Sequence, residues 1–291
     1  MGTLIKNDSV AVRIREIPML SAVVSRLLEI TSNEDHSIND VSRIVENDTF
    51  LTSRILRIAN SAAFSPIEPI QTVSKAVSYL GEKMLIGIAI GSGSGKVFRK
   101  PLEGYESGVG ELWEHSLRTA IASREISNLV KKDSISDIAF TAGLLHDVGK
   151  SVISEFLEGN TRELTSLCDQ GMAEDFLAAE KTMTGTDHSE VGYQLAQHWR
   201  LPAALSEVIR YHHHPAQADE GHRTLVYAVH LGDIIAMMGG AGTGADSFAY
   251  KIDENYDKYI GISKEDLALV LLKVEVEFSK TKKFVFGSEE V

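Results

Sequence analysis

The chain carries a series of histidine and aspartate residues that are able to bind metal ions. Imidazole nitrogens and carboxylate oxygens are the protein ligands that suit iron, manganese and zinc. Seven such residues occur in the order His115, His146, Asp147, His188, His212, His213 and Asp233. Because these residues are far apart in the sequence, they can form one site only if a fold gathers them from several segments. Their order and spacing therefore predict a metal site assembled from distant elements.

The surroundings of two of these residues support this hypothesis. His146 and Asp147 are adjacent in the segment 143–150, which ends at Lys150. A histidine and the aspartate after it can reach the same ion, or the aspartate can bridge two ions. Asp233 lies inside an apolar stretch, residues 225–238, where an unpaired buried carboxylate would be costly. A nearby cation would remove that cost.

The pair His212 and His213 leaves two interpretations open. Both imidazoles can serve one ion, or one can bind the ion while the other holds a phosphate. Among the remaining histidines, His214 and His230 are candidates for orienting a ligand through the second ring nitrogen. For isolated histidines we favour a structural role, because most buried polar side chains simply satisfy their hydrogen bonds.

The segment from Leu112 to Asp233 resembles the HD superfamily of metal-dependent phosphohydrolases, whose pattern is H…HD…H…HH…D. The preceding part resembles the N-terminal half of HDOD proteins, a regulatory branch of that superfamily. The second resemblance rests on four short segments, at 17–20, 44–48, 55–62 and 76–81. Together the two resemblances cover roughly residues 10–238 and identify the chain as a member of the HDOD group.

This resemblance implies a role for each candidate residue. One ion would be held by His115, His146, Asp147 and Asp233. Asp147 would bridge to a second ion held by His188, His212 and His213. Two divalent or trivalent ions are expected, iron (Fe) or manganese (Mn) first, with zinc (Zn) or nickel (Ni) as substitutes.

Asp147 and Lys150 are the candidate catalytic residues. Paired cations would activate a bridging water and clamp a phosphate, while the Lys150 ammonium would neutralise a phosphoryl oxygen. The branch that degrades cyclic di-GMP carries a Gly-Tyr-Pro loop after the histidine pair. Residues 214–223 contain no such element, so cyclic di-GMP phosphodiesterase activity is not expected.

Two hypotheses about function follow. HDOD relatives often lose metal ligands and resemble signalling or scaffold modules, whereas this chain keeps the full set. We favour a signalling or regulatory protein that acts through a signalling protein partner or a small phosphorylated ligand. The alternative is an active metal-dependent phosphohydrolase or phosphodiesterase on a nucleotide or other phosphate ester. An open coordination position beside Lys150 would favour the enzyme, and a closed site would favour the regulator.

The composition narrows the class of protein. The chain has 291 residues, 43% hydrophobic and 24% charged, which is typical of a folded globular protein. Its formal net charge of -12 argues against nucleic acid as a partner, because phosphate contacts need clustered Lys and Arg. Cys168 is the only cysteine, which indicates a reducing compartment. No signal peptide or membrane-spanning pattern is visible, so we expect a cytoplasmic protein without a membrane partner.

Apolar residues recur with a three-four spacing almost everywhere, and no stretch alternates like a strand, so we expect an all-α, multi-helix bundle. The expected parts are an N-terminal helical half (10–105), an HD-like metal subdomain (106–240) and a C-terminal helical extension (241–291). Ser37 and Thr72 are expected helix caps, and Thr186 or Asp187 should cap the helix that begins with His188. A last amphipathic helix is expected over 263–280.

Two glycine-rich stretches are expected to interrupt the helices. Residues 91–95 superficially resemble a phosphate-binding loop, but Ile90 and Val97 occupy positions that require Gly and Ser or Thr. We therefore interpret them as the start of a connection between the two halves. Residues 239–244 are expected to be a flexible break.

Overall fold

The structure is a computed structural model that describes residues 7–31, 36–60, 66–93, 97, 100–130, 133–247 and 250–285. Across these residues the regular structure is helical, and the sole strand-like feature is an isolated bridge between Leu102 and Ser107. The all-α expectation is confirmed. None of the described helices is long and apolar enough to cross a membrane. The boundaries proposed at 105 and 240 stay predictions.

The described residues up to 93 form six helices. They are α1 (Asn7–Glu16), α2 (Ala22–Thr31), α3 (Ile38–Glu46), α4 (Thr49–Ala59), α5 (Val73–Leu80) and α6 (Glu82–Gly93). Ser37 begins α3 with a reciprocal capping box: its hydroxyl accepts from the backbone N–H of Asp40, whose carboxylate accepts from the backbone N–H of Ser37. Thr72 caps α5 through the N–H of Lys75. Both expected caps are confirmed.

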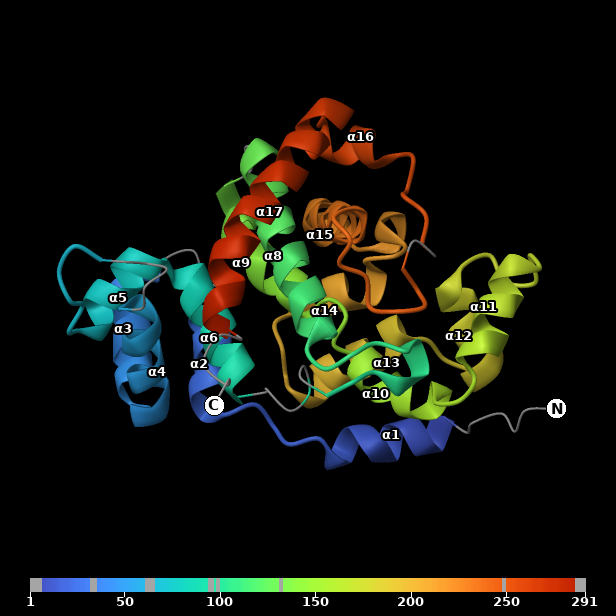
Figure 1. Cartoon of the computed structure of the whole chain (residues 1–291), viewed down its shortest axis with the longest axis horizontal. Coiled ribbons are helices and arrows are strands. Elements are labelled where there is room, and N and C mark those ends of the chain that lie inside the picture. The colour runs from blue at the N-terminus through green and yellow to red at the C-terminus, as the bar shows by residue number, and fades with distance from the viewer. Residues whose placement is uncertain are drawn as a thin grey trace.

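The following segment builds the helices around the candidate site. They are η1 (Glu103–Tyr105), α8 (Glu111–Val130), α9 (Asp133–Leu145), α10 (Lys150–Leu157), α11 (Thr161–Asp169), α12 (Phe176–Thr184), α13 (His188–His198), α14 (Ala203–Tyr211), η2 (Pro215–Gln217) and α15 (Glu220–Met238). In Figure 1, α8, α9 and α15 lie in the middle of the molecule, between α2–α6 on one side and α11–α12 on the other. The chain ends with α16 (Tyr256–Ile260) and α17 (Lys264–Val285).

Glycines let the three central helices approach closely. A Cβ atom at Gly143 of α9 would come within 2.8 Å of the Cα atom of Ala120 on α8. A Cβ atom at Gly232 of α15 would come within 2.5 Å of Ser123 Oγ, also on α8. Because neither position has a side chain, α8, α9 and α15 bring the residues that they carry within reach of one another.

The first helix is tied to the second half of the chain. Arg13 of α1 binds Glu155 of α10 through Nε (2.7 Å) and Nη2 (2.9 Å). In the turn after α1, the carbonyl of Ile17 accepts a hydrogen bond from His198 Nε2, and that of Pro18 accepts one from Trp199 Nε1. Both are 3.1 Å long. His198 therefore has the structural role that we expected for isolated histidines.

The structure corrects two expectations about glycine-rich segments. α6 continues through Gly93, so residues 91–93 are helical and do not begin a connection; residues 94–96 lie outside the described part. The apolar segment 85–90 of α6 is buried, and this burial outweighs the modest helix penalty of glycine. Residues 239–244 do interrupt the helices, but Ala241 and Thr243 are buried, so this break is packed into the fold.

Candidate metal centre

The seven candidate ligands come from five places in the fold and converge. α8 supplies His115 and α15 supplies Asp233, while His146 and Asp147 lie in the turn between α9 and α10. Asp187 caps α13 and so places His188 at its first position, as expected. His212 and His213 follow the end of α14.

Gly149 explains how the turn that carries Asp147 can lie against α13. A Cβ atom at this position would overlap the backbone carbonyl oxygen of His188 and would come within 2.6 Å of the backbone nitrogen of Gly192. The turn after α9 therefore packs backbone against backbone on the first two turns of α13. Asp147 and His188 reach the same space because no side chain separates their main chains.

The first group of ligands surrounds one oxygen of Asp147. His115 Nε2 lies 3.3 Å from Asp147 Oδ2 and 3.1 Å from Asp233 Oδ1. His146 Nε2 lies 3.5 Å from Asp147 Oδ2 and 3.6 Å from Asp233 Oδ1. Ligand atoms of His115, His146 and Asp147 all lie within 4.8 Å of one another.

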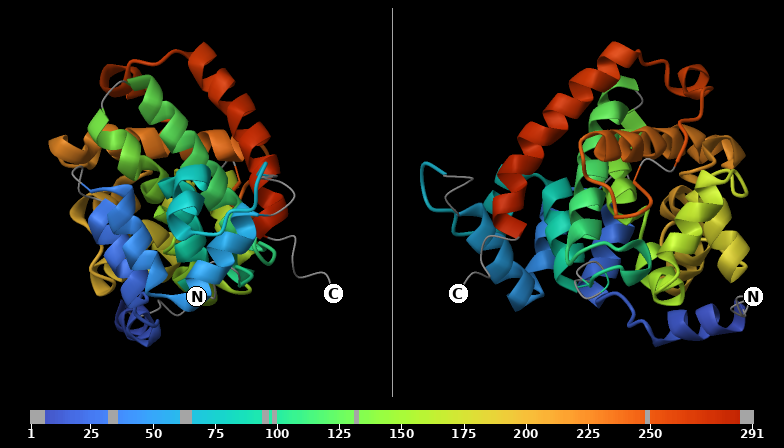
Figure 2. Two further views of the ribbon diagram at one scale, coloured as in Figure 1. Left: turned by 90° about the vertical axis from the view of Figure 1, so that its left-hand side faces the viewer. Right: turned by 45° about the vertical axis from the view of Figure 1, so that its right-hand side comes forward.

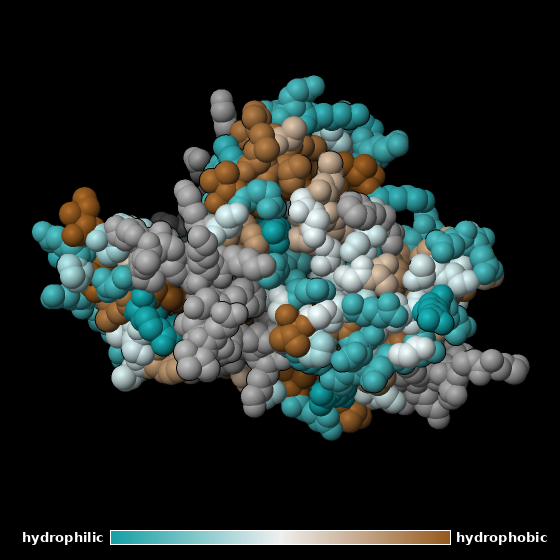
Figure 3. Space-filling view, viewed as in Figure 1, coloured by the Kyte–Doolittle hydropathy of each residue, from teal (hydrophilic) through white to brown (hydrophobic). Residues whose placement is uncertain are grey.

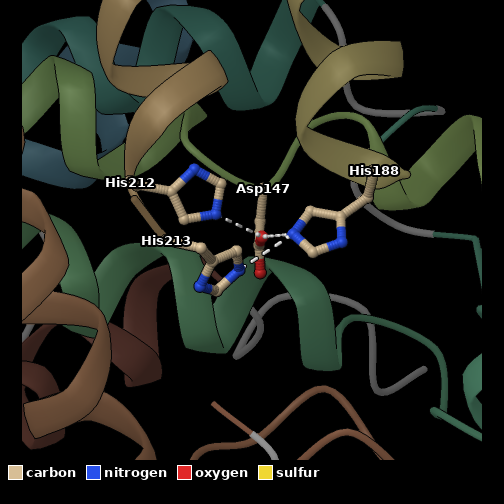
Figure 4. A group of neighbouring side chains, drawn as sticks. All are labelled: Asp147, His188, His212 and His213. Atoms are coloured by element: carbon tan, nitrogen blue, oxygen red, sulfur yellow. Dashed lines mark hydrogen bonds and ion pairs between the residues drawn. The ribbon is translucent and has the colours of Figure 1, made fainter. Parts of the chain in front are cut away.

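The second group surrounds the other oxygen of Asp147, as Figure 4 shows. His188 Nε2 and His212 Nε2 each lie 3.5 Å from Asp147 Oδ1, and His213 Nε2 lies 3.0 Å from His188 Nε2. Ligand atoms of these four residues also lie within 4.8 Å of one another. Asp147 thus stands between the two groups, where a bridging ligand is required; its bridging role itself stays a prediction.

Hydrogen bonds on the outer ring nitrogens fix the orientation of four imidazoles. Nδ1 of His115, His146 and His212 donates to a backbone carbonyl, at 2.6 Å to Ala241, 2.8 Å to Gly143 and 3.0 Å to Ile209. Nδ1 of His188 donates to the carboxylate of Glu180 at 2.9 Å. Because Nδ1 holds a proton in each ring, Nε2 presents a lone pair to the centre, as in metal-binding histidines.

These inner atoms fit a cation. The Nε2 atoms of His115 and His146 face each other at 3.3 Å, and two lone pairs cannot do so without a proton or a cation between them. Among the described residues, both oxygens of Asp147 and Nε2 of His212 are buried and have close neighbours but no aligned hydrogen bond. A metal ion would satisfy these atoms, whereas leaving them unsatisfied is costly.

Burial and neighbouring charges shift the pKa values of the ligands in opposite directions. Burial disfavours protonation of His115, but the Asp147 and Asp233 carboxylates outweigh it and raise the pKa of His115 to about 10. Burial lowers the pKa of His212 to about 4. Burial opposes ionisation of Asp147, yet the Lys150 charge beside it holds the pKa of this carboxyl well below its usual range. A metal ion bound at His115 must displace a proton there, so metal affinity falls as the pH falls.

Lys150, a candidate catalytic residue, lies at the edge of the centre and already has close partners there. Its Nζ atom is 2.7 Å from Asp147 Oδ2, 2.6 Å from Asp246 Oδ2 and 2.9 Å from Thr243 Oγ1. The ammonium donates hydrogen bonds to Asp246 and Thr243, and it forms an ion pair with Asp147 without an aligned hydrogen bond. The two carboxylates also raise the pKa of Lys150 against the effect of burial, so the side chain stays charged.

The segment after α15 closes the centre. Ala241 accepts the hydrogen bond of His115, Asp246 holds Lys150, and the Tyr250 ring stacks on the His213 ring with centroids 4.0 Å apart. The Tyr250 hydroxyl donates to Asp246 Oδ2 at 3.1 Å. Each of the following side chains is at most 2% exposed: His115, His146, Asp147, Lys150, His188, His212 and Asp233.

The sequence reasoning missed several residues of the centre. Glu180 was detectable, because it occupies the apolar face of α12 together with Phe176 and Leu177, and a carboxylate there needs a partner. Asp246 and Tyr250 gave no such signal, because they belong to an irregular segment without periodicity. His230 was a candidate for orienting a ligand: its Nδ1 atom donates to the backbone carbonyl of His212 at 2.8 Å.

Comparison with known proteins agrees with this architecture. The HDOD domain family profile matches residues 17–215, which is more than half of the chain. An uncharacterised protein of Treponema pallidum (strain Nichols) is 26% identical over 222 residues, which cover 76% of this chain and 42% of that protein. The chain therefore spans less than half the length of that relative.

Solved structures share the fold over most of its length. An HDOD domain protein of unknown function from Geobacter sulfurreducens is 24% identical, with a TM-score of 0.69 over 96% of this chain and 99% of that one. A proposed phosphohydrolase from Shewanella amazonensis SB2B is 26% identical, with a TM-score of 0.66 over 95% and 98%. A proposed signal transduction protein from Marinobacter aquaeolei VT8 is 20% identical, with a TM-score of 0.74 over 99% and 61%. The chain belongs to the HDOD family.

Proposed function

We propose that this chain is a cytoplasmic regulatory module with a closed, structural di-metal site, which acts through a signalling protein partner or a small phosphorylated ligand. The observation that carries the proposal is that the Lys150 ammonium is already paired with two buried carboxylates. The cation that would meet a phosphoryl oxygen is held in ion pairs between Asp147 and Asp246, and Thr243 accepts a hydrogen bond from it. A substrate could reach this ammonium only after Thr243 and Asp246 had moved.

The gathered ligands suit a structural role because they lie on elements far apart in the sequence. A cation between His115, Asp147 and Asp233 would connect α8, the turn before α10, and α15. A ligand that binds only the folded chain stabilises it by mass action, by about 2.7 kcal/mol when its free concentration is a hundred times the Kd. Bound metal would therefore fix the core whose outer surfaces meet a partner.

The runner-up is a metal-dependent phosphohydrolase or phosphodiesterase, and the convergence of all seven ligands favours it. Bound in such a site, a metal pair supplies an activated water and a clamp for a phosphate. In this reading Asp147 would hold the cations, and Lys150 would leave Asp246 to meet a phosphoryl oxygen. The names of two Shewanella amazonensis SB2B structures, both proposed phosphohydrolases, are in line with it.

One experiment separates the two readings. Untagged protein, purified without chelator, would be analysed for metal by elemental mass spectrometry, and then assayed with p-nitrophenyl phosphate and bis(p-nitrophenyl) phosphate after loading with Fe, Mn, Zn or Ni. We expect about two ions per chain, as a paired site requires, a melting temperature that rises on loading, and no hydrolysis. Asp147→Ala should lose the metal and the thermal gain.

The opposite result is equally clear. Hydrolysis that depends on added metal and disappears in Asp147→Ala would overturn the regulatory proposal in favour of the enzyme. Wild-type protein that takes up no metal, with the same melting temperature in metal and in EDTA, would contradict both readings of the centre.

A further inference from the structure

The last helix, α17, presents apolar side chains to solvent as well as to the protein. Its inner face is buried on α8 and carries Val270, Val274 and Phe278. Its opposite face carries Leu269, Leu272 and Val276, which are 58%, 64% and 60% exposed. The views in Figure 2 show α17 lying along the outside of the molecule, and we call these three exposed residues the outer stripe.

α17 is held rigidly in this position. Arg118 of α8 lies over the Phe278 ring at 3.5 Å and binds Glu275 at 2.9 Å. Arg124 of α8 binds Glu277 through two nitrogens, at 2.5 and 3.0 Å. These contacts are made by the inner face and the flanks of α17. They leave the outer stripe as a preformed surface that needs no ordering before it binds.

The outer stripe adjoins further apolar surface. A groove of about 630 Å³ runs between α15, α16 and α17, and Ile234, Met238, Ile252, Leu267 and Leu271 contribute to its lining. Figure 3 shows the corresponding hydrophobic area over the upper part of α17, beside α16. An apolar area of this kind, rimmed by charged residues such as Asp257 and Lys264, is typical of a protein interaction surface.

We propose that this surface binds a second copy of the chain, with the two α17 helices packed antiparallel about a two-fold axis next to Leu272. The pattern along α17 is self-complementary about that point. Leu269 and Val276 are equally distant from the midpoint between residues 272 and 273, so each meets the other across the axis. A two-fold interface requires such reciprocity, because the same patch must serve both copies.

One pair of opposite charges on α17 fits the same axis. The helix begins with Lys264, Glu265 and Asp266 and ends with lysines at 280, 282 and 283. Antiparallel pairing about the same midpoint sets Glu265 of one copy at the level of the partner subunit's Lys280. The helix holds five lysines and four acidic residues and is therefore nearly neutral. Two α17 helices repel each other less than other faces of two chains with a net charge of -12 would.

The test is the oligomeric state of the full chain, measured by light scattering after gel filtration at concentrations up to about 100 μM, a range that detects the weak association expected of one helix pair. The wild type should approach twice the chain mass of 31.8 kDa. Leu272→Glu sets two carboxylates near the axis and should return the mass to that of one chain. Met172→Glu, at a position exposed to the same degree (62% against 64%) but after α11, is the matched control and should stay dimeric.

Two further variants test the orientation. Glu265→Lys should weaken the dimer, and Lys280→Glu in the same chain should restore it. In a Cys168→Ser background, Leu272→Cys should form a disulfide-linked dimer under mild oxidation, whereas Met172→Cys should not. Circular dichroism checks that each variant is folded.

Two outcomes would overturn the proposal. A wild-type chain that stays monomeric over the whole concentration range would leave the outer stripe to a helix of another protein. A dimer that survives Leu272→Glu would place the interface elsewhere. Neither result depends on whether the metal centre is structural or catalytic.

Discussion

Glu180→Gln tests whether metal affinity depends on the carboxylate behind His188. Glu180 is fully buried and accepts three hydrogen bonds: from His188 Nδ1 at 2.9 Å, from the His188 backbone N–H at 2.8 Å and from the Tyr105 hydroxyl at 2.5 Å. A glutamine amide keeps one acceptor oxygen and turns two donor hydrogens toward groups that also donate. The His188 ring would then lose both its orientation and part of its basicity.

The size of the effect follows from these contacts. Removal of a carboxylate behind a metal-binding histidine lowers metal affinity about 10- to 100-fold. At about 1.4 kcal/mol for each factor of ten, this is a loss of roughly 1.4–2.8 kcal/mol. The metal-free variant should also unfold more easily, because a buried hydrogen bond to a charged group contributes about 1.5–3 kcal/mol.

The assay is competition for metal against a chelating dye at fixed pH, together with melting temperatures with and without metal. Glu190→Gln is the matched control: Glu190 lies in the first turn of the same helix, α13, and pairs with Arg210 at 3.1 Å, but its side chain is 38% exposed and lies outside the centre. It should bind metal like the wild type. If folded Glu180→Gln also binds metal like the wild type, the orienting role assigned to Glu180 is wrong.

Two other predictions concern packing and acid stability. In Gly149→Ala the new Cβ atom would overlap the His188 carbonyl, so urea unfolding should show that the free energy of unfolding falls by more than about 3 kcal/mol. In the control Gly221→Ala, where the space is open, it should fall by less than about 1 kcal/mol. Equal losses in the two variants would contradict the close contact at Gly149. Hydrogen bonds from Arg13 and the nearby Lys100 lower the pKa of Glu155 from 4.5 to about 2, so these ion pairs should stabilise the fold above pH 4.5 and lose that effect as the pH falls toward 2. Because the groups are partly exposed, the contribution is below about 1 kcal/mol, and unfolding of Glu155→Gln should depend less on acid pH than that of the wild type; an identical pH profile would refute this.

The seven candidate ligands could be found from the sequence because their chemistry resides in the residue type. Imidazole and carboxylate groups keep their affinity for metals in any fold, and their order in the chain follows a family pattern. Helix caps such as Ser37 and Thr72 were predictable for a similar reason, since one hydroxyl satisfies a backbone donor three residues away.

The closure of the centre could not be predicted in the same way. It depends on the path of the backbone through 239–247, where no periodic pattern constrains the chain. That path places Asp246 beside Lys150, although 96 positions separate them. The prediction for Gly91 and Gly93 was wrong for the opposite reason: their local preference for a turn was outweighed by the burial of the apolar residues just before them on α6.

Retention of a complete ligand set does not by itself distinguish catalysis from structure. Both uses need the same inner nitrogens and oxygens, and both need Nδ1 of His115 and His188 to be engaged. The difference lies in the groups that are left over for a substrate. Here Lys150 is held by the Asp147 and Asp246 carboxylates and by Thr243, and the Tyr250 ring covers His213. Both restraints come from the residues after α15, 241–247 and Tyr250. Their contacts with Lys150 and His213 are therefore the physical reason to favour regulation over turnover, whereas the ligands alone would favour neither.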